Sequence, residues 1–142
     1  MNLKTSLIEL QCEMVAERNL VNPKNISWLQ YDILYQLEKE KEILPKDLSL
    51  LLGVSRTKLS KALKDLKNMG YIRQSPDKLD GRQLYTSLTE SGRDLLENIS
   101  RKHTSIYNIA LESFSKEEQK EFMYLSNLLA SELRKSRLEK DE

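Results

Sequence analysis

Apolar residues recur at intervals of three and four positions through most of the chain, and short polar runs divide the segments that carry them. That spacing is typical of amphipathic helices, which turn one apolar side towards a core. It predicts a first helix over residues 3–19 and a second helix that ends near Lys39. Ser27 and Gln30 have the spacing of a capping box, so we expect the second helix to begin directly after Ser27. The alternating charges of residues 38–42 then predict a solvated connection.

A short third helix and a longer fourth one follow, joined by a tight turn. Pro45 suits the first turn of a helix and Gly53 suits the position just past a helix end, which predicts a helix of about eight residues between them. Two residues later, Ser55 can cap the next helix, which Gly70 ends. Two helices joined by such a turn form a helix-turn-helix, in which the second helix is presented outwards.

The fourth predicted helix has two different sides when its residues are placed about 100° apart. Its apolar residues fall on one side, namely Leu59, Ala62, Leu63, Leu66 and Met69. The opposite side gathers hydroxyl, amide and ammonium groups from Thr57, Ser60, Lys61, Lys64 and Asn68, with Lys58 and Lys67 beside them. We therefore expect this helix to bury its apolar side and to expose a basic, hydrogen-bonding surface.

Two β-prone runs, residues 71–75 and 84–88, are separated by a polar stretch that holds the turn pair Asp-Gly at 80–81. We predict a hairpin whose tip carries Lys78 and Arg82. A helix-turn-helix followed directly by a hairpin has the element order of a winged helix. The predicted fold is therefore α-rich, of the α+β class.

Helical spacing resumes after the hairpin. A long helix is predicted after Thr89, with apolar residues continuing to Ala110. His103 falls on its apolar side, where we expect an interface residue rather than a ligand or a sensor. A second capping box begins at Ser115 and opens a final helix that ends near Arg137.

The chain as a whole is expected to be one domain over residues 1–142. Within it, the winged helix takes about residues 26–90. Such a small core cannot also bury the apolar stripes of residues 1–25 and 91–142. We therefore predict that these outer helices form a helical dimerisation region.

The formal net charge is only +1, but the basic residues are concentrated in one part of the chain. Residues 55–82 hold eight basic and three acidic side chains, a net charge of +5, which leaves −4 for the remainder. Such asymmetry is expected for a surface that contacts a polyanion. The alternative is an ordinary solvated helix face, which the position of the lysines between a glycine turn and a basic hairpin disfavours.

Several classes of protein are disfavoured. Acidic residues or lysines interrupt the apolar runs, so we expect no membrane span and a cytoplasmic location. One cysteine, Cys12, and one histidine, His103, cannot supply the ligands of a zinc finger, and no metal is predicted. The sequence holds no glycine-rich phosphate loop and no pattern of paired catalytic side chains, so we expect neither an enzyme nor a cofactor.

The order of the elements, together with three motifs, resembles the MarR (multiple antibiotic resistance regulator) family of transcriptional regulators. The motifs are LGVSRTKLSKALKDLKNMGYI at 52–72, DGR at 80–82 and LTESGRDLL at 88–96, and the likeness covers most of the chain from Ser27 to Arg137. It implies an intertwined homodimer with two winged-helix lobes, which binds a pseudo-palindromic operator and usually represses transcription. In that family the wing arginine enters the minor groove and an aspartate two residues earlier holds it in position, roles that fall to Arg82 and Asp80.

A recognition helix fits a major groove about 12 Å wide, with its first residues nearest the base edges. Arg56 is the best candidate for a bidentate contact with guanine, while the lysines should supply salt-dependent, sequence-independent affinity. The predicted DNA-binding residues are Ser55, Arg56, Thr57, Lys58, Ser60, Lys61, Lys64, Arg73, Lys78, Asp80 and Arg82.

The resemblance also raises two hypotheses about regulation. Trp28, Tyr31 and Tyr35 lie on the second helix, which in this family lines a cleft where small aromatic anions bind; packing residues are the simpler alternative. A ligand there would act by changing the spacing of the two recognition helices. The second hypothesis is that Cys12 is an oxidant sensor, as in some peroxide-responsive members; an inert thiol is the simpler alternative, because no basic residue adjoins Cys12 to lower its pKa. A winged helix that docks protein or RNA is a further alternative, for which apolar or acidic anchors would be expected.

Overall fold

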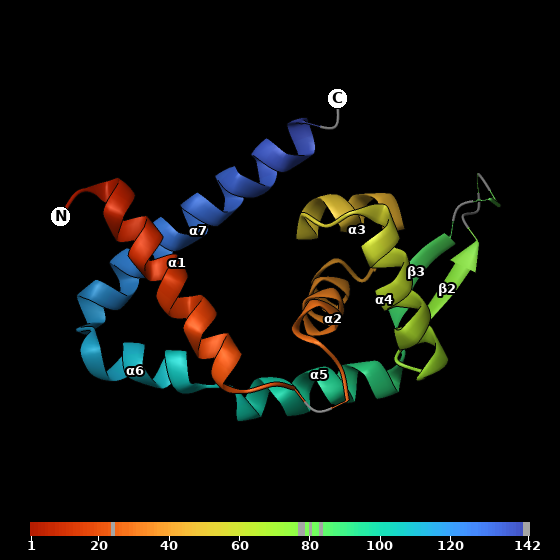
Figure 1. The fold of residues 1–142 in the computed structure, drawn as a ribbon, viewed down its shortest axis with the longest axis horizontal. Helices are drawn as coiled ribbons and strands as arrows, with labels where there is room; N and C mark the ends of the chain where they lie inside the picture. The colour runs from red at the N-terminus through yellow and green to blue at the C-terminus, as the bar shows by residue number, and fades with distance from the viewer. Residues whose placement is uncertain (24, 77–78, 80, 83, 141–142) are drawn as a thin grey trace.

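The computed structural model describes residues 1–23, 25–76, 79, 81–82 and 84–140 of the 142-residue chain. The described elements are, in chain order, α1 (Leu3–Leu20), α2 (Trp28–Glu40), β1 (Glu42–Ile43), α3 (Pro45–Leu52), α4 (Arg56–Asn68), β2 (Ile72–Pro76), β3 (Leu84–Leu88), α5 (Glu90–Lys102), α6 (Ser105–Ser113) and α7 (Lys116–Glu139). In Figure 1, α2, α3, α4 and the sheet form one body, α1, α6 and most of α7 lie on the other side, and α5 joins the two. The predicted α-rich winged helix is confirmed.

Side-chain caps explain where the first two helices begin. Asn2 Oδ1 accepts a hydrogen bond from the Thr5 amide at 2.9 Å and starts α1. At α2, Ser27 Oγ accepts from the Gln30 amide at 3.1 Å, and Gln30 Oε1 accepts from the Ser27 amide at 2.9 Å, so the predicted capping box is confirmed. The buried Gln30 side chain also donates to the carbonyl of Ala62 at 3.4 Å, which ties the start of α2 to the middle of α4.

The segment after α2 differs from the prediction. Charge alternation predicts a solvated connection over residues 38–42, whereas α2 continues through part of it and strand β1 starts at Glu42. β1 pairs antiparallel with β3, with Ile43 opposite Thr86. Ile43 is buried, so one apolar side chain anchors this charged segment to the sheet. A strand of two residues is too short to show the alternation on which strand prediction depends.

The predicted helix-turn-helix is formed by α3 and α4. Gly53 ends α3 with φ of +66°, in the left-handed region that favours glycine. The Val54 amide donates to the Ser49 carbonyl at 3.1 Å and closes the turn. Ser55 Oγ then accepts from the Lys58 amide at 3.1 Å and caps α4. Backbone conformation and hydrogen bonds thus fix the direction in which α4 leaves the turn.

One core lies beneath the helix-turn-helix and the sheet. Its buried residues come from α2 (Ile33, Leu34, Leu37), α3 (Leu48, Leu51), α4 (Leu59, Ala62, Leu63, Leu66), the sheet (Ile43, Ile72, Leu88) and α5 (Leu96, Ile99), with Ile26 before α2. The prediction that Met69 belongs to the apolar side of α4 is wrong, because Met69 is 41% exposed. Met69 is the C-cap of α4, beside Gly70 with φ of +83°, and helical spacing no longer sets its direction there.

The sheet has the strand order β1-β3-β2. The β2–β3 pair is the predicted hairpin, with Ile72 opposite Leu88 at its base and Pro76 opposite Leu84 towards its tip. Ile72 and Leu88 are buried in the core, whereas Leu84 is 37% exposed. The hairpin is therefore anchored at its base and extends away from the core at its tip (Figure 1).

The long helix predicted after the hairpin is two helices. α5 ends at Lys102, His103 has φ of −110° and ψ of 67°, and α6 begins at Ser105. The His103 ring lies edge-on to the Trp28 ring, with 5.1 Å between their centroids. His103, predicted to be an interface residue, thus packs against α2 of its own chain. Helical spacing alone cannot detect a break across which the apolar stripe continues.

The apolar stripes of α1, α6 and α7 are not covered within the single chain. The structure describes every residue of these three helices and none of these residues is buried. Large apolar side chains that are at least 40% exposed include Leu7, Ile8, Leu10 and Val15 of α1, Ile106 and Ile109 of α6, and Leu125, Leu128, Leu129 and Leu133 of α7. The winged helix has its own core, whereas these helices leave an extended apolar surface open.

Candidate nucleic-acid interface

The exposed side of α4 carries the polar residues predicted for it. All seven predicted residues from this element and its cap are exposed, namely Ser55, Arg56, Thr57, Lys58, Ser60, Lys61 and Lys64. On the other side of the helix, Leu59 and Leu66 are almost completely buried. Core packing thus prevents α4 from rotating about its axis, so the basic side faces outward.

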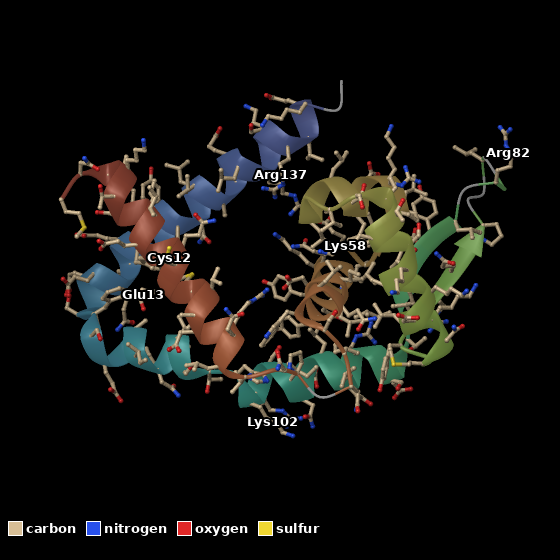
Figure 2. All side chains as sticks on the ribbon, viewed as in Figure 1. Cys12, Glu13, Lys58, Arg82, Lys102 and Arg137 are labelled. Carbon is tan, nitrogen blue, oxygen red and sulfur yellow. The ribbon has the colours of Figure 1, made fainter. Side chains whose placement is uncertain are left out.

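The N-terminal turn of α4 is the part best placed to reach a groove, because all of its residues from Ser55 to Lys58 are exposed. Figure 2 shows Arg82 at the tip of the wing, beyond the strands that follow α4. Ser55 Oγ already accepts the Lys58 amide proton, so its hydroxyl retains its own hydrogen for donation to another acceptor. The helix N-terminus also directs positive dipole potential towards an approaching phosphate.

Two predicted wing residues are described and two lie outside the described part of the chain. Arg73, in β2 opposite Ser87, is exposed, and Arg82, in the hairpin turn, is exposed as well. Lys78 and Asp80 are outside the described residues. The predicted pairing between Asp80 and Arg82 therefore stays a prediction.

A hollow joins the wing to the helix-turn-helix. Its lining residues are Leu44, Pro45, Lys46, Arg56, Gln74, Arg82 and Leu84, and its volume is about 340 Å³. Three cationic side chains thus border one depression, each from a different element: the first turn of α3, the first turn of α4 and the hairpin turn. No acidic side chain is among these lining residues of the described chain.

Lys46 is a residue that the sequence reasoning missed. The basic segment defined by the charge count begins at residue 55, and Lys46 lies before it, at the start of α3. Its position in the first turn of the first helix of a helix-turn-helix is a signal that could have identified it, since that end of the helix faces the hairpin. The fold brings it to Arg56 and Arg82.

The three aromatic residues predicted to line a cleft do not line the same one. Trp28 and Tyr31 border a cavity of about 160 Å³ together with Glu17, Arg18, Val21, His103, Ser105 and Ile106. Tyr35 is 52% exposed and borders a separate depression of about 410 Å³ between α2 and α5. Tyr31 lies between the two, and its hydroxyl is 2.9 Å from Ser100 Oγ.

Arg18 connects this aromatic cavity to α1. Its Nη1 and Nη2 donate to the two carboxylate oxygens of Asp32 at 2.9 and 2.7 Å, and its guanidinium lies 4.9 Å from the Trp28 ring centre. The hydrogen bond to Asp32 is the main reason that the pKa of Arg18 is raised, while burial opposes it. The Trp28 Nε1–H donates to the carbonyls of Arg18 and Val21, which fixes the end of α1 against the start of α2.

Cys12 lies on α1 and is exposed (Figure 2). Within the described part of the chain, no group of three or more His, Cys, Asp or Glu side chains is arranged to hold a metal ion. No helix described in the structure combines the length and the apolar character needed to cross a membrane.

Comparison with known proteins agrees with this geometry. Residues 24–83 match the model of the MarR family. The uncharacterised HTH-type transcriptional regulator YwaE of Bacillus subtilis (strain 168) is 28% identical over 119 residues, which cover 84% of this chain and 68% of that protein. The transcriptional repressor MprA of Escherichia coli (strain K12) is 28% identical over 95 residues, which cover 65% of this chain and 54% of MprA.

The chain also resembles a solved structure in its fold. NadR, in complex with 4-hydroxyphenylacetate, has a TM-score of 0.77 at 23% identity, with 94% of this chain and 93% of that chain covered. The fold is a winged helix with an exposed basic helix, and the relatives named above are transcriptional regulators. Within that class, residues 24–83 are similar to the MarR family, and the multiple antibiotic resistance repressor MarR shares the fold with a TM-score of 0.76 at 19% identity.

Proposed function

We propose that the chain is a cytoplasmic, homodimeric repressor that binds double-stranded DNA sequence-specifically at a pseudo-palindromic operator. The observation that carries the proposal is the hollow bordered by Lys46, Arg56 and Arg82 beside the exposed side of α4. Cations from three elements around one depression, with no acidic side chain among its described lining residues, suit a polyanion such as a DNA backbone better than a neutral partner. The proposal assigns the chain no enzymatic activity.

In this mechanism α4 enters the major groove, and the residues from Ser55 to Lys58 lie nearest the base edges. Arg56 reads guanine, Thr57 and Ser60 supply hydroxyl contacts, and Lys58, Lys61 and Lys64 neutralise phosphates. In the wing, Arg82 enters the minor groove with Asp80 holding it, while Arg73 and Lys78 contact the backbone. Sequence preference then depends mainly on α4 and Arg82, and the lysines contribute affinity that falls with salt.

Dimerisation is proposed for residues 1–25 and 91–142, with the winged helix over about residues 26–90 as the DNA-binding part. The exposed apolar residues of α1, α6 and α7 support it, because monomeric proteins rarely leave so many unpartnered stripes open. A twofold dimer would carry two α4 helices, which must lie about 34–36 Å apart to read half-sites one helical turn apart.

Release by a small aromatic ligand is a second part of the proposal, favoured by the cavity beside Trp28 and Tyr31. An aromatic ring there would contact the indole and phenol rings, and its polar group would meet Arg18 or His103. Asp32 already occupies both terminal nitrogens of Arg18, so an anion would compete with that carboxylate. NadR, of similar fold, is solved with 4-hydroxyphenylacetate, an anion of this kind. Tyr35 would act only in the neighbouring depression.

Oxidant sensing through Cys12 is the alternative for regulation, and its exposure on α1 makes it accessible. If a Cys12→Ser variant still releases DNA on peroxide treatment, Cys12 is not the oxidant sensor. The docking of protein or RNA is disfavoured because the exposed side of α4 is mainly basic, with Asp65 as its one acidic side chain, and offers no large apolar anchor.

The experiment that tests the proposal is selection of duplex DNA from a random library, followed by binding measurements over a range of salt concentrations. We expect an inverted repeat and an affinity that falls steeply with salt. Affinity that does not change with salt, or selection without an inverted repeat, would contradict it. Sedimentation velocity of the free protein tests the dimer separately.

A further inference from the structure

Arg137, near the end of α7, holds the end of α3. Its Nε donates to the carbonyl of Leu50 at 3.1 Å and its Nη2 donates to the carbonyl of Leu51 at 3.1 Å. Figure 2 shows Arg137 on the side of α7 that faces α3. The two residues that accept are separated from Arg137 by most of the chain, so this contact depends on the tertiary fold.

The chemistry of the contact is that of a helix C-terminus. The last carbonyls of a helix have no partner within it, and the end of the helix dipole is negative. At the end of α3, Gly53 N–H donates to Leu50 and Val54 N–H donates to Ser49, so the Leu51 carbonyl depends on another donor. The planar guanidinium of Arg137 supplies two parallel N–H groups and a positive charge to this end.

A second arginine, three residues earlier on α7, contacts the end of α2. Arg134 Nη2 forms an ion pair with Glu40, the last residue of that helix, and both side chains are only about a third exposed or less, at 28% and 32%. Among the described side-chain hydrogen bonds, those that join α7 to the winged-helix body come from Arg134 and Arg137. α7 buries no residue of its own against that body, so these polar contacts carry the attachment.

Arg134 and the apolar residues Leu125 and Leu129 lie on different sides of α7. Arg134 follows Leu125 by nine residues, which places the two about 180° apart around the helix axis. Leu125 and Leu129, which are 59% and 43% exposed, belong to the surface proposed for dimerisation. α7 thus contacts the helix-turn-helix with one side while its other side is available to the partner.

We infer that Arg137, supported by Arg134, is a positioning residue that fixes the recognition helix relative to the dimerisation helices and thereby sets the spacing between the two half-sites that the dimer accepts. The inference rests on the proposed function. The path is short: Arg137 holds the Leu51 carbonyl, Gly53 turns the chain, and Ser55 caps α4. If the contacts of Arg134 and Arg137 were lost, the winged helix would be connected to the dimerisation region only by α5 and by two contacts of α1, the Arg18–Asp32 pair and the Trp28 hydrogen bonds, among the contacts of the described residues.

The test compares the wild type with Arg137→Gln, which removes the charge and the guanidinium fork. Lys135→Gln is the matched control, because Lys135 is an exposed cation on the same helix turn. Each protein is titrated with three duplexes that hold the selected inverted repeat with its natural spacing, one base pair less and one base pair more, and with a duplex that holds a single half-site. Sedimentation velocity confirms that each variant remains a dimer.

We expect Arg137→Gln to lose about tenfold in affinity for the natural spacing, a typical size for changes that alter coupling between two sites. It should discriminate less against the altered spacings, while its affinity for the single half-site stays within about twofold of wild type. Lys135→Gln should behave as the wild type does. A spacing profile identical to that of wild type in Arg137→Gln would overturn the inference. Wild type that selects no inverted repeat would instead overturn the proposed function.

Arg137→Lys keeps the inference testable if the glutamine variant does not fold or dimerise. It retains the charge but supplies no planar fork, so we expect a spacing profile between those of wild type and Arg137→Gln. Amide hydrogen exchange gives a readout that needs no DNA: the amides of Gly53 and Val54 should exchange faster in both variants than in Lys135→Gln. Unchanged exchange at these amides would also contradict the role of Arg137.

Discussion

Arg56 and Arg82 border the same hollow, although Arg56 begins the recognition helix and Arg82 lies in the hairpin turn. Their spatial relationship is set by the core, since α4 packs through Leu59 and Leu66 and the base of the hairpin packs through Ile72. A contact made by one arginine therefore constrains where the other can reach. Major-groove and minor-groove contacts on this side of the protein should act together.

Arg82→Ala should weaken binding to the selected operator by about tenfold to a hundredfold, because it removes one specific arginine contact worth about 1–3 kcal/mol. Fluorescence anisotropy with labelled operator DNA measures the effect. Lys102→Ala is the control, since Lys102 is an exposed cation at the far end of α5 (Figure 2) and should leave affinity unchanged. Equal affinities for Arg82→Ala and wild type would show that the wing has been assigned wrongly.

Lys46→Ala tests whether the hollow holds a phosphate. Loss of one phosphate contact should lower affinity by a similar factor for operator and for unrelated DNA, and should reduce the slope of log K against log salt concentration by about 0.9. Arg56→Ala should behave differently, with a loss concentrated on the operator and relaxed preference at one base pair. A Lys46→Ala variant that keeps the wild-type salt slope would exclude Lys46 from the interface.

These residues illustrate how far the sequence could lead. The apolar stripe of α4 and its caps depend on neighbours within four positions, so helical spacing predicts both the helix and its exposed residues correctly. Arg137 is placed at the end of α3 only by tertiary contacts, and no local pattern marks it, whereas the position of Lys46 in the first turn of the helix-turn-helix is a signal that charge counting passes over. Strand β1 also depends on a tertiary contact, because Ile43 pairs with Thr86 of β3, far along the chain. The end of α5 at His103 coincides with another such contact, the packing of the His103 ring on Trp28.

Gly92→Ala should destabilise the protein strongly. A Cβ at this position would lie 2.0 Å from the carbonyl oxygen of Tyr71, a backbone atom that also accepts the Thr89 amide proton at 3.1 Å. Relief of the overlap requires the start of α5 to move away from the hairpin base, at a cost of about 3 kcal/mol. Urea unfolding measures the loss. Gly81→Ala is the control because a Cβ added there would meet nothing within 4 Å, and a similar loss in that variant would contradict the argument.

The pair between Glu38 and Arg93 makes stability depend on pH. The Arg93 hydrogen bond, at 2.9 Å, is the main reason that the pKa of Glu38 is lowered, and Lys41 adds to this while burial opposes it. Because the folded pKa lies below the ordinary value of 4.5, the contribution is complete above about pH 5 and is lost as the pH falls through the folded pKa. Both side chains are partly exposed, so the contribution should stay within about 1 kcal/mol.

Glu38→Gln should therefore be less stable than wild type at neutral pH, and the difference should disappear in acid. Thermal unfolding of both proteins between about pH 3 and pH 7 measures it. Glu121→Gln, a like change at an exposed position of α7, serves as the control and should show little pH-dependent difference from wild type. A difference between wild type and Glu38→Gln that grows towards low pH would have the wrong sign for this pair.

Leu125→Glu should separate dimerisation from folding. Leu125 is 59% exposed in the single chain, so a charge there should leave the winged-helix core intact but oppose burial against a partner. We expect a folded monomer in sedimentation velocity, with operator affinity reduced by at least about a hundredfold because the two half-sites are no longer bound together. Asn127→Glu places the same charge about 200° away around α7 and should remain a dimer. If Leu125→Glu were dimeric and Asn127→Glu monomeric, the partner would cover the opposite side of α7, where Arg134 contacts Glu40.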